Sequence, residues 1–176
     1  MIIEAETILI GLGHLLKGDL GISYYIIEAL ALEGLEKKAK LVFLAEETEK
    51  LDVFLFKKKE AIIIVPAVLN LKPGKILCWD YDDFLKRYPL VSHIQPYKKI
   101  YDSFYLLKLI DALPKDITII SISVEQTRKA IISIKAIKAA RKVINIVKRK
   151  ILEENIGKVS RIYSVKDLIS AKNLVF

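Results

Sequence analysis

Short apolar runs alternate with longer amphipathic stretches along this chain of 176 residues. The runs are rich in isoleucine and valine, and they fall at residues 7–11, 41–44, 61–65, 76–79 and 117–122. Such runs are typical of strands that are buried on both faces of a parallel sheet. None reaches the ~18–20 apolar residues that a membrane-spanning helix needs, so we expect no insertion into a membrane.

The stretches between the runs predict helices. Apolar residues recur there at spacings of three and four over residues 19–35, 48–58, 81–88 and 96–111, and again in a basic segment that extends to about residue 154. Gly34 is placed to end the first of these helices, Pro96 to begin the fourth, and Pro66 to stop the third strand. The alternation predicts an α/β fold, a three-layer α/β/α sandwich with a mostly parallel central sheet.

The same pattern sets the expected domain organisation. We expect one α/β domain over residues 1–156 and a C-terminal extension over residues 157–176 that packs on the domain, either in the same molecule or across a dimer. In a sheet of this kind, ligands bind beyond the carboxyl ends of the strands. The loops that follow Ile10, Leu44, Val65 and Ile122, together with the loop before Pro96, are therefore where a site is expected.

The net charge of +8 comes largely from one segment, because nine basic residues lie between positions 128 and 150. A surface that binds nucleic acid would carry such a charge. The same segment also has apolar residues at helical spacing, which predicts that they face inward and that the lysines form the solvated face. These apolar residues are Ile131, Ile134, Ala140, Val143, Ile144, Val147 and Ile151. We therefore favour a solvated helix over a nucleic-acid partner.

Cys78 is the only cysteine, which excludes disulfides and cysteine zinc sites. It lies inside an apolar run, where a buried structural thiol is expected. The N-terminus has no basic segment ahead of its first apolar run, so a cytoplasmic protein is expected. Abundant isoleucine and lysine with only two glutamines are typical of a thermophile.

Motifs for nucleotides and metals are incomplete. Gly11-Leu12-Gly13 begins like a dinucleotide fingerprint, but Leu16 stands at the third glycine. If residues 13–18 are aligned with a P-loop, Asp19 occupies the position of the motif's lysine, where a carboxylate would repel phosphate. The only imidazoles are His14 and His93, and one imidazole with Asp19 falls short of the three protein ligands of a catalytic zinc site.

Residues 8–21, Ile-Leu-Ile-Gly-Leu-Gly-His-Leu-Leu-Lys-Gly-Asp-Leu-Gly, resemble the opening motif of the hydrogenase maturation proteases. That motif is a strand, then G-x-G-N-x-L-x-x-D-[DE]-G, then a helix. In the same order, residues 61–68 with Lys-Pro-Gly-Lys-Ile at 72–76 are similar to the family's strand and P-G turn, and residues 91–109 to its S-x-H loop and helix. The last strand and helix also fit, so the resemblance spans about residues 7–152.

The resemblance implies an endopeptidase that removes a C-terminal extension from the large subunit of nickel-iron hydrogenase after nickel has been inserted. Members carry no metal of their own and are thought to sense nickel in the precursor through two carboxylates and a histidine. The corresponding positions here hold Leu20, Pro66 and, in the favoured alignment, Tyr97. An alignment shifted by four residues brings His93 near the histidine position instead. The motif asparagine is His14, and Glu47-Thr48-Glu49-Lys50 replaces the family's G-T-x-G loop.

Three hypotheses follow. In the first, the chain is a non-catalytic or altered-specificity relative, a pseudoenzyme, in which Leu20, Pro66 and Tyr97 form an apolar surface for a protein partner. In the second, it is an active endopeptidase (a hydrolase), with Asp19 and either His14 or His93 as a carboxylate–imidazole pair. In the third, it is a structural subunit. All three imply no bound cofactor or metal, and a hydrogenase-like large subunit is the candidate partner.

Overall fold

Five strands form one sheet in this computed structural model, which describes residues 6–45, 47–125 and 130–153. The strand order is β2-β1-β3-β5-β4. The strands are β1 Thr7–Leu12, β2 Lys40–Leu44, β3 Glu60–Ala67, β4 Ile76–Asp80 and β5 Asp116–Ser123. All neighbours pair in parallel except β4, which runs antiparallel to β5 at one edge. The mostly parallel sheet predicted from the sequence is confirmed.

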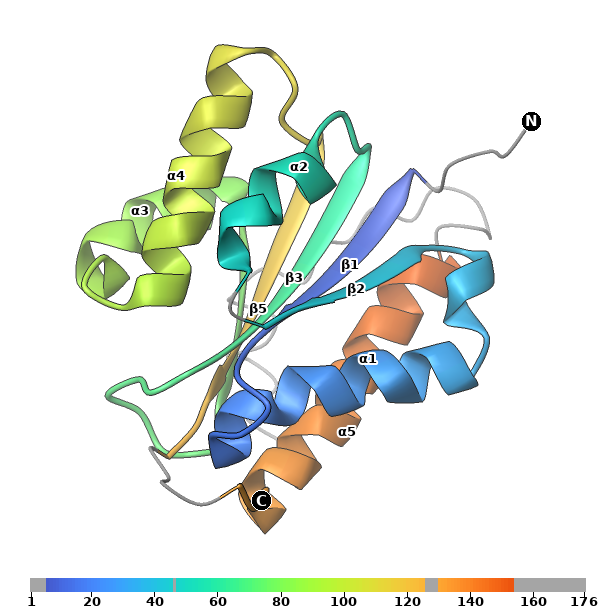
Figure 1. Ribbon diagram of the computed structural model, residues 1–176, viewed down its shortest axis with the longest axis vertical. Helices are drawn as coiled ribbons and strands as arrows, with labels where there is room; N and C mark the ends of the chain where they lie inside the picture. Colours follow the sequence, from blue (N-terminus) through green and yellow to red (C-terminus); the bar gives the residue numbers. More distant parts are fainter. Residues whose placement is uncertain (1–5, 46, 126–129, 154–176) are drawn as a thin grey trace.

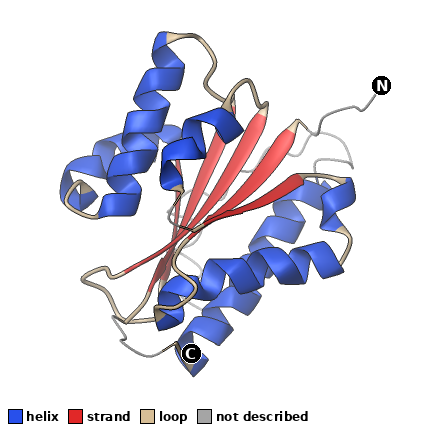
Figure 2. Ribbon diagram, viewed as in Figure 1, coloured by secondary structure: helices blue, strands red, loops and turns tan. Residues whose placement is uncertain are grey.

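Helices cover both faces of the sheet, as Figures 1 and 2 show. They are α1 Ile22–Leu32, α2 Leu51–Leu55, α3 Tyr81–Val91, α4 Gln95–Leu109 and α5 Ile134–Glu153. Helices α1 and α5 cover one face, and α2, α3 and α4 cover the other. Each face buries its own apolar cluster, because successive strand residues point to opposite sides of the sheet. The three-layer sandwich is therefore confirmed.

Pro66 does not stop the third strand, which corrects the prediction. Strand β3 continues to Ala67, and Pro66 is paired in register with Ile122 of β5. The pairing of β3 with β1 has already ended, at Ile64 opposite Gly11. Beyond Ile64, β3 has a strand partner on one side only, so a residue without an N–H can be accommodated there.

The predicted helix bounds are too wide at two places. A 3-10 turn, Gly18–Gly21, precedes α1, so the α-helix begins at Ile22 and not at Asp19. Another such turn, Thr48–Lys50, leads into α2, which ends at Leu55. Gly34 follows α1 in the left-handed conformation, with a φ of 80°, as a helix-ending glycine does.

The inward face of α5 is only partly the one predicted. Ile131 and Ile134 are 68% and 72% exposed, so their assignment to the core is wrong. The stripe that faces the sheet consists of Ala136, Ala139, Ala140, Val143, Val147 and Ile151. Ile134 lies two positions, or about 200° of helical rotation, before Ala136, and it therefore points away from the sheet.

Lys150 also departs from the predicted solvated face. Its ammonium nitrogen lies 3.3 Å from Glu60 Oε1 and 3.2 Å from Asp116 Oδ2. These carboxylates begin β3 and β5, so the ion pairs hold α5 against the amino edge of the sheet. Burial alone would lower the pKa of Lys150, but the attraction of Asp116 and Glu60 outweighs it and raises that pKa.

No helix within the described residues is long and apolar enough to cross a membrane. The predicted extension at residues 157–176 lies outside the described part of the chain.

Candidate functional site

Three loops meet at the carboxyl edge of the parallel strands, which is where the sequence predicts a site. They follow β1, β3 and β5, and polar contacts join them. Ser123 Oγ donates to the Leu71 carbonyl at 3.1 Å, and Gly74 N–H donates to the Ser123 carbonyl at 2.7 Å. The loop after β3 is therefore fastened to the end of β5.

Asp19 fastens the loop after β1 to the start of α5. Its side chain is 1% exposed and accepts two hydrogen bonds from Ser133, from the backbone N–H at 2.6 Å and from the hydroxyl at 2.7 Å. Ser133 Oγ in turn accepts from Ala136 N–H at 3.2 Å, which makes Ser133 the N-cap of α5. A carboxylate at a helix N-terminus also interacts favourably with the helix dipole. Asp19 therefore joins the loop after β1 to the start of α5.

Gly13 permits a close approach of backbones at the end of β1. A Cβ on this residue would lie 2.3 Å from the Leu20 carbonyl oxygen and 2.9 Å from Ser23 Oγ. The loop is closed by His14 N–H, which donates to the same Leu20 carbonyl at 2.9 Å. The glycine of the opening motif is therefore explained by packing within this loop, with no phosphate needed.

The two histidines occupy different parts of the fold. His14 is half-buried in the loop after β1, whereas His93 is exposed in the turn between α3 and α4. That turn joins two helices of one layer, whereas Asp19 and Ser133 lie just before α1 and α5 of the other layer. Within the described residues, no group of three or more His, Cys, Asp or Glu side chains is arranged to hold a metal ion.

Tyr97 is fully buried between α4 and the sheet. Its hydroxyl donates to Ser121 Oγ at 2.8 Å, and its ring centroid lies 5.7 Å from that of Trp79. Burial raises the pKa of Tyr97 to about 12, although the hydrogen bond to Ser121 works in the opposite direction. The phenol is therefore a neutral core group near neutral pH.

The apolar surface expected from Leu20, Pro66 and Tyr97 does not exist as such. Pro66 and Tyr97 are buried, and Leu20 is half-buried against the core beneath α1 and α5. By strand alternation Pro66 points to the α1 and α5 face, whereas Tyr97 contacts Ser121 on the other face. The three positions consequently share no exposed surface.

A different apolar rim lies at this edge, and it was not predicted from the sequence. Its six side chains come from the three loops and from the first residue of α5, and each is more than a third exposed. They are Leu15, Leu16, Val68, Leu71, Ile131 and Ile134. The available signal was apolar residues inside segments that lack strand or helix periodicity. The same loops contain two exposed lysines, Lys17 directly after Leu16 and Lys72 directly after Leu71.

Cys78 lies in β4 with its side chain buried, and burial raises the pKa of its thiol to about 12. A thiol with that pKa stays protonated near neutral pH and is a poor nucleophile. This environment agrees with the structural role predicted for Cys78.

The three-layer sandwich is the architecture of a known class of maturation endopeptidases. The chain has the fold of the hydrogenase maturation proteases. It superposes on the hydrogenase maturating endopeptidase HybD of E. coli with a TM-score of 0.71, at 16% identity, over 84% of this chain and 93% of that one. For the [NiFe] hydrogenase maturation protease HybD from Thermococcus kodakarensis, the TM-score is 0.67 at 16% identity, over 82% and 98%.

A hydrogenase 2 maturation peptidase from a Thaumarchaeota archaeon has a TM-score of 0.61 at 16% identity, over 82% of this chain and 96% of that one. No family model matches the sequence, and no curated protein matches it. At such low identity the similarity establishes the fold alone.

Proposed function

We propose that this chain is a non-catalytic, polypeptide-binding relative of the hydrogenase maturation proteases that does not sense nickel through the family's positions. The proposal rests on which residues occupy those positions. The side chains of Leu20 and Pro66 have no lone pair to donate to a metal, and the Tyr97 hydroxyl is buried in a hydrogen bond to Ser121. A divalent metal of nickel's kind prefers imidazole and carboxylate ligands.

The rim at the carboxyl edge supports binding of a polypeptide. Exposed apolar side chains that gather in one place are typical of interaction surfaces. Here they lie in the loops that follow β1, β3 and β5 and at the start of α5, at the edge where ligands of such sheets bind. Lys17 and Lys72 give this edge a positive charge, which favours a partner segment that combines apolar side chains with carboxylates. By analogy with the relatives' substrates, a hydrogenase-like large subunit is the first partner to test.

An active endopeptidase is the alternative, and the placement of Asp19 and His93 argues against it. A general base needs an accessible carboxylate or imidazole within reach of the substrate. Both oxygens of Asp19 accept hydrogen bonds from Ser133, and the side chain is 1% exposed. His93 lies in the turn between α3 and α4, two helices that cover the other face of the sheet. Using Asp19 as a base would require breaking its hydrogen bonds to Ser133, the N-cap residue of α5.

The test is incubation with the nickel-loaded precursor of a hydrogenase large subunit at equimolar enzyme, followed by intact mass measurement. A maturation protease with its own precursor serves as the positive control. We expect no loss of the C-terminal extension. Appearance of the shortened subunit would overturn the non-catalytic assignment.

Binding is measured separately on the same precursor, by interferometry with and without nickel. The variant Leu16→Glu/Ile131→Glu places charges in the rim, and Leu32→Glu, at a side chain 89% exposed at the end of α1, is the matched control. We expect the rim variant to lose at least tenfold in affinity and the control to lose none. Equal affinity for all three proteins would remove the rim from the proposal.

A further inference from the structure

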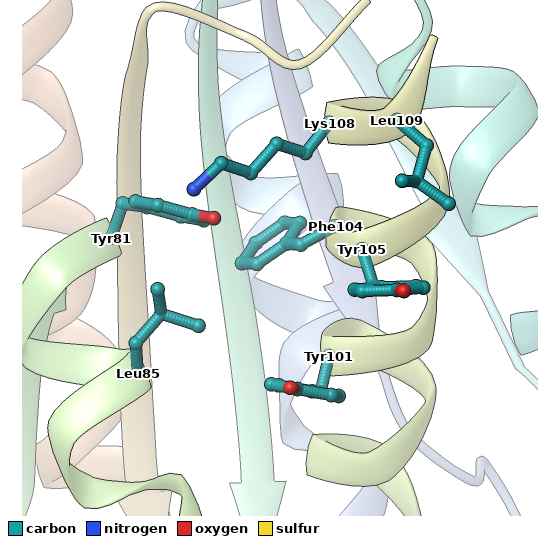
Figure 3. Close-up of a pocket in the computed structure, with 7 residues that line it drawn as sticks. All are labelled: Tyr81, Leu85, Tyr101, Phe104, Tyr105, Lys108 and Leu109. Carbon is teal, nitrogen blue, oxygen red and sulfur yellow. The ribbon is translucent and has the colours of Figure 1, made fainter.

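A groove between α3 and α4 opens to solvent on the outer side of their layer, with a volume of about 320 Å³ (Figure 3). Helix α3 contributes Tyr81 and Leu85, and α4 contributes Tyr101, Phe104 and Tyr105 among others. Four aromatic rings and two leucines therefore form its walls, with Lys108 at one end. The groove belongs to the α2, α3 and α4 layer and is separate from the carboxyl-edge rim.

The apolar surface continues from the groove along the exposed side of α4. Tyr105 is 59% exposed and Leu109 is 66% exposed, and next to them Leu106 and Ile110 are 46% and 54% exposed. Single exposed apolar residues are ordinary on protein surfaces, but two adjacent pairs one helical turn apart form a continuous row. A row of this kind fits an elongated partner better than a small molecule, which the groove alone would hold.

The floor of the groove is fixed by packing beneath it. The Tyr81 and Phe104 rings lie with centroids 5.7 Å apart, and Tyr88 stacks on Tyr101 at 4.0 Å with the two planes 5° apart. Phe104 itself is 1% exposed. Because these side chains are already ordered, a ligand would not have to pay much conformational entropy to arrange them.

Lys108 gives the groove its polarity. Its ammonium nitrogen lies 5.6 Å from the centroid of the Tyr81 ring, and its side chain extends across the end of the groove (Figure 3). No carboxylate among the described residues lies within ion-pair distance of it. A cation held over an aromatic wall is thus available to a negative group on a ligand.

We propose that the groove between α3 and α4 binds a polypeptide segment of a partner protein, which inserts large apolar side chains between the helices and places an aspartate or glutamate against Lys108. The exposed row on α4 extends the contact beyond the groove, and the charge of Lys108 sets the direction of the segment. This surface is independent of the carboxyl-edge rim, so it stands whether or not the proposed function holds.

The experiment is selection of displayed random 12-residue peptides on the whole protein and on three variants. Lys108→Glu reverses the charge, and Tyr105→Ala/Leu109→Ala removes apolar contacts. Lys38→Glu is a charge-matched control at an exposed lysine between α1 and β2. These side chains are all exposed, so each variant should keep the wild-type circular dichroism and urea midpoint. We expect the wild type and Lys38→Glu to enrich peptides with clustered apolar residues and one acidic residue.

The strongest enriched peptide is then synthesised with a fluorescent label and titrated by anisotropy. We expect Lys108→Glu to weaken its binding at least tenfold, and a peptide with lysine in place of the acidic residue to recover affinity for that variant only. Tyr105→Ala/Leu109→Ala should weaken both peptides. Recovery by charge exchange is a result that a merely structural lysine would not give.

Three outcomes would overturn the proposal. The selection could yield no shared pattern, or the enriched peptides could bind all variants equally. Sedimentation could also reveal dimers that Tyr105→Ala/Leu109→Ala abolishes and the peptide does not displace, in which case a second copy of the chain occupies the groove.

Discussion

Asp19→Asn should destabilise the fold strongly, because Asp19 is a structural carboxylate in this account. The asparagine side chain has nearly the same shape, and its one oxygen can still accept the Ser133 N–H bond at 2.6 Å. Its amide nitrogen cannot accept from the Ser133 hydroxyl, which donates to Asp19 Oδ2 at 2.7 Å. The negative charge at the N-terminus of α5 is also lost.

The magnitude follows from these two losses. A hydrogen bond to a charged group contributes about 1.5–3 kcal/mol, and the helix-terminus interaction adds about 0.3–1 kcal/mol, more when partly buried. We therefore expect a decrease of about 2–4 kcal/mol in the free energy of unfolding. With a urea m-value of about 2 kcal/mol/M, the midpoint should fall by about 1–2 M.

Urea unfolding followed by circular dichroism is the assay, with Glu36→Gln as the control at an exposed carboxylate. The control should stay within about 0.5 kcal/mol of wild type. Combining Asp19→Asn with Ser133→Ala completes a double-mutant cycle, in which the two changes should be non-additive by about 1 kcal/mol or more. A midpoint for Asp19→Asn equal to wild type, or strict additivity, would refute the structural role and reopen Asp19 as a catalytic carboxylate.

Three further outcomes are expected. Tyr97→Phe should lower the free energy of unfolding by about 1–2 kcal/mol, because Ser121 Oγ is left buried without its donor. The double variant Tyr97→Phe/Ser121→Ala should recover part of that loss in the same urea assay. Lys150→Met should destabilise the fold at neutral pH, because it removes the cation that pairs with both Glu60 and Asp116. Since the folded-state pKa of Lys150 is raised, this contribution is present below the ordinary lysine pKa of about 10.4 and is lost as pH rises through the raised value. The urea midpoints of wild type and variant should therefore converge at strongly alkaline pH. Cys78 should not react with a thiol reagent at pH 8 until urea unfolds the chain, because its thiol is buried with a pKa of about 12; rapid reaction of the native protein would contradict its placement.

The strands were predictable from sequence because each is a short apolar run. A strand that is covered on both faces is apolar throughout, so it can be recognised without knowing which strands lie beside it. The misplaced stop at Pro66 shows the limit of this reasoning. A proline ends a strand only where its missing N–H would leave a partner without a hydrogen bond. Whether it does so depends on where β1 ends beside β3, and that is a property of the sheet.

The site was less predictable because its contacts span long distances in sequence. Asp19 and Ser133 are 114 residues apart, and Tyr97 and Ser121 are 24 apart. A carboxylate and a histidine near a glycine-rich loop suggest chemistry when read alone. The partner of Asp19 is a helix cap instead, and Tyr97 reaches a serine of the core. Only the folded chain brings these partners together.

The same limit explains the rim at the carboxyl edge. Helical spacing assigned Ile131 and Ile134 to the core, since it assumed that the helix extended through both positions. Helix α5 begins at Ile134 and is fixed there by Ser133, which leaves the two isoleucines exposed beside the loops after β1 and β3. A prediction of the cap would have required knowing that Asp19 anchors it.

Nickel titration by calorimetry tests the central claim most directly, because that claim is the loss of nickel recognition at the family's positions. The titration uses the whole protein and the variant His14→Ala/His93→Ala, which removes both imidazoles of the chain. We predict no saturable heat at micromolar nickel for either protein. Binding with micromolar affinity in the wild type that disappears in the double variant would contradict the account, because it would demonstrate a selective metal site that includes a histidine.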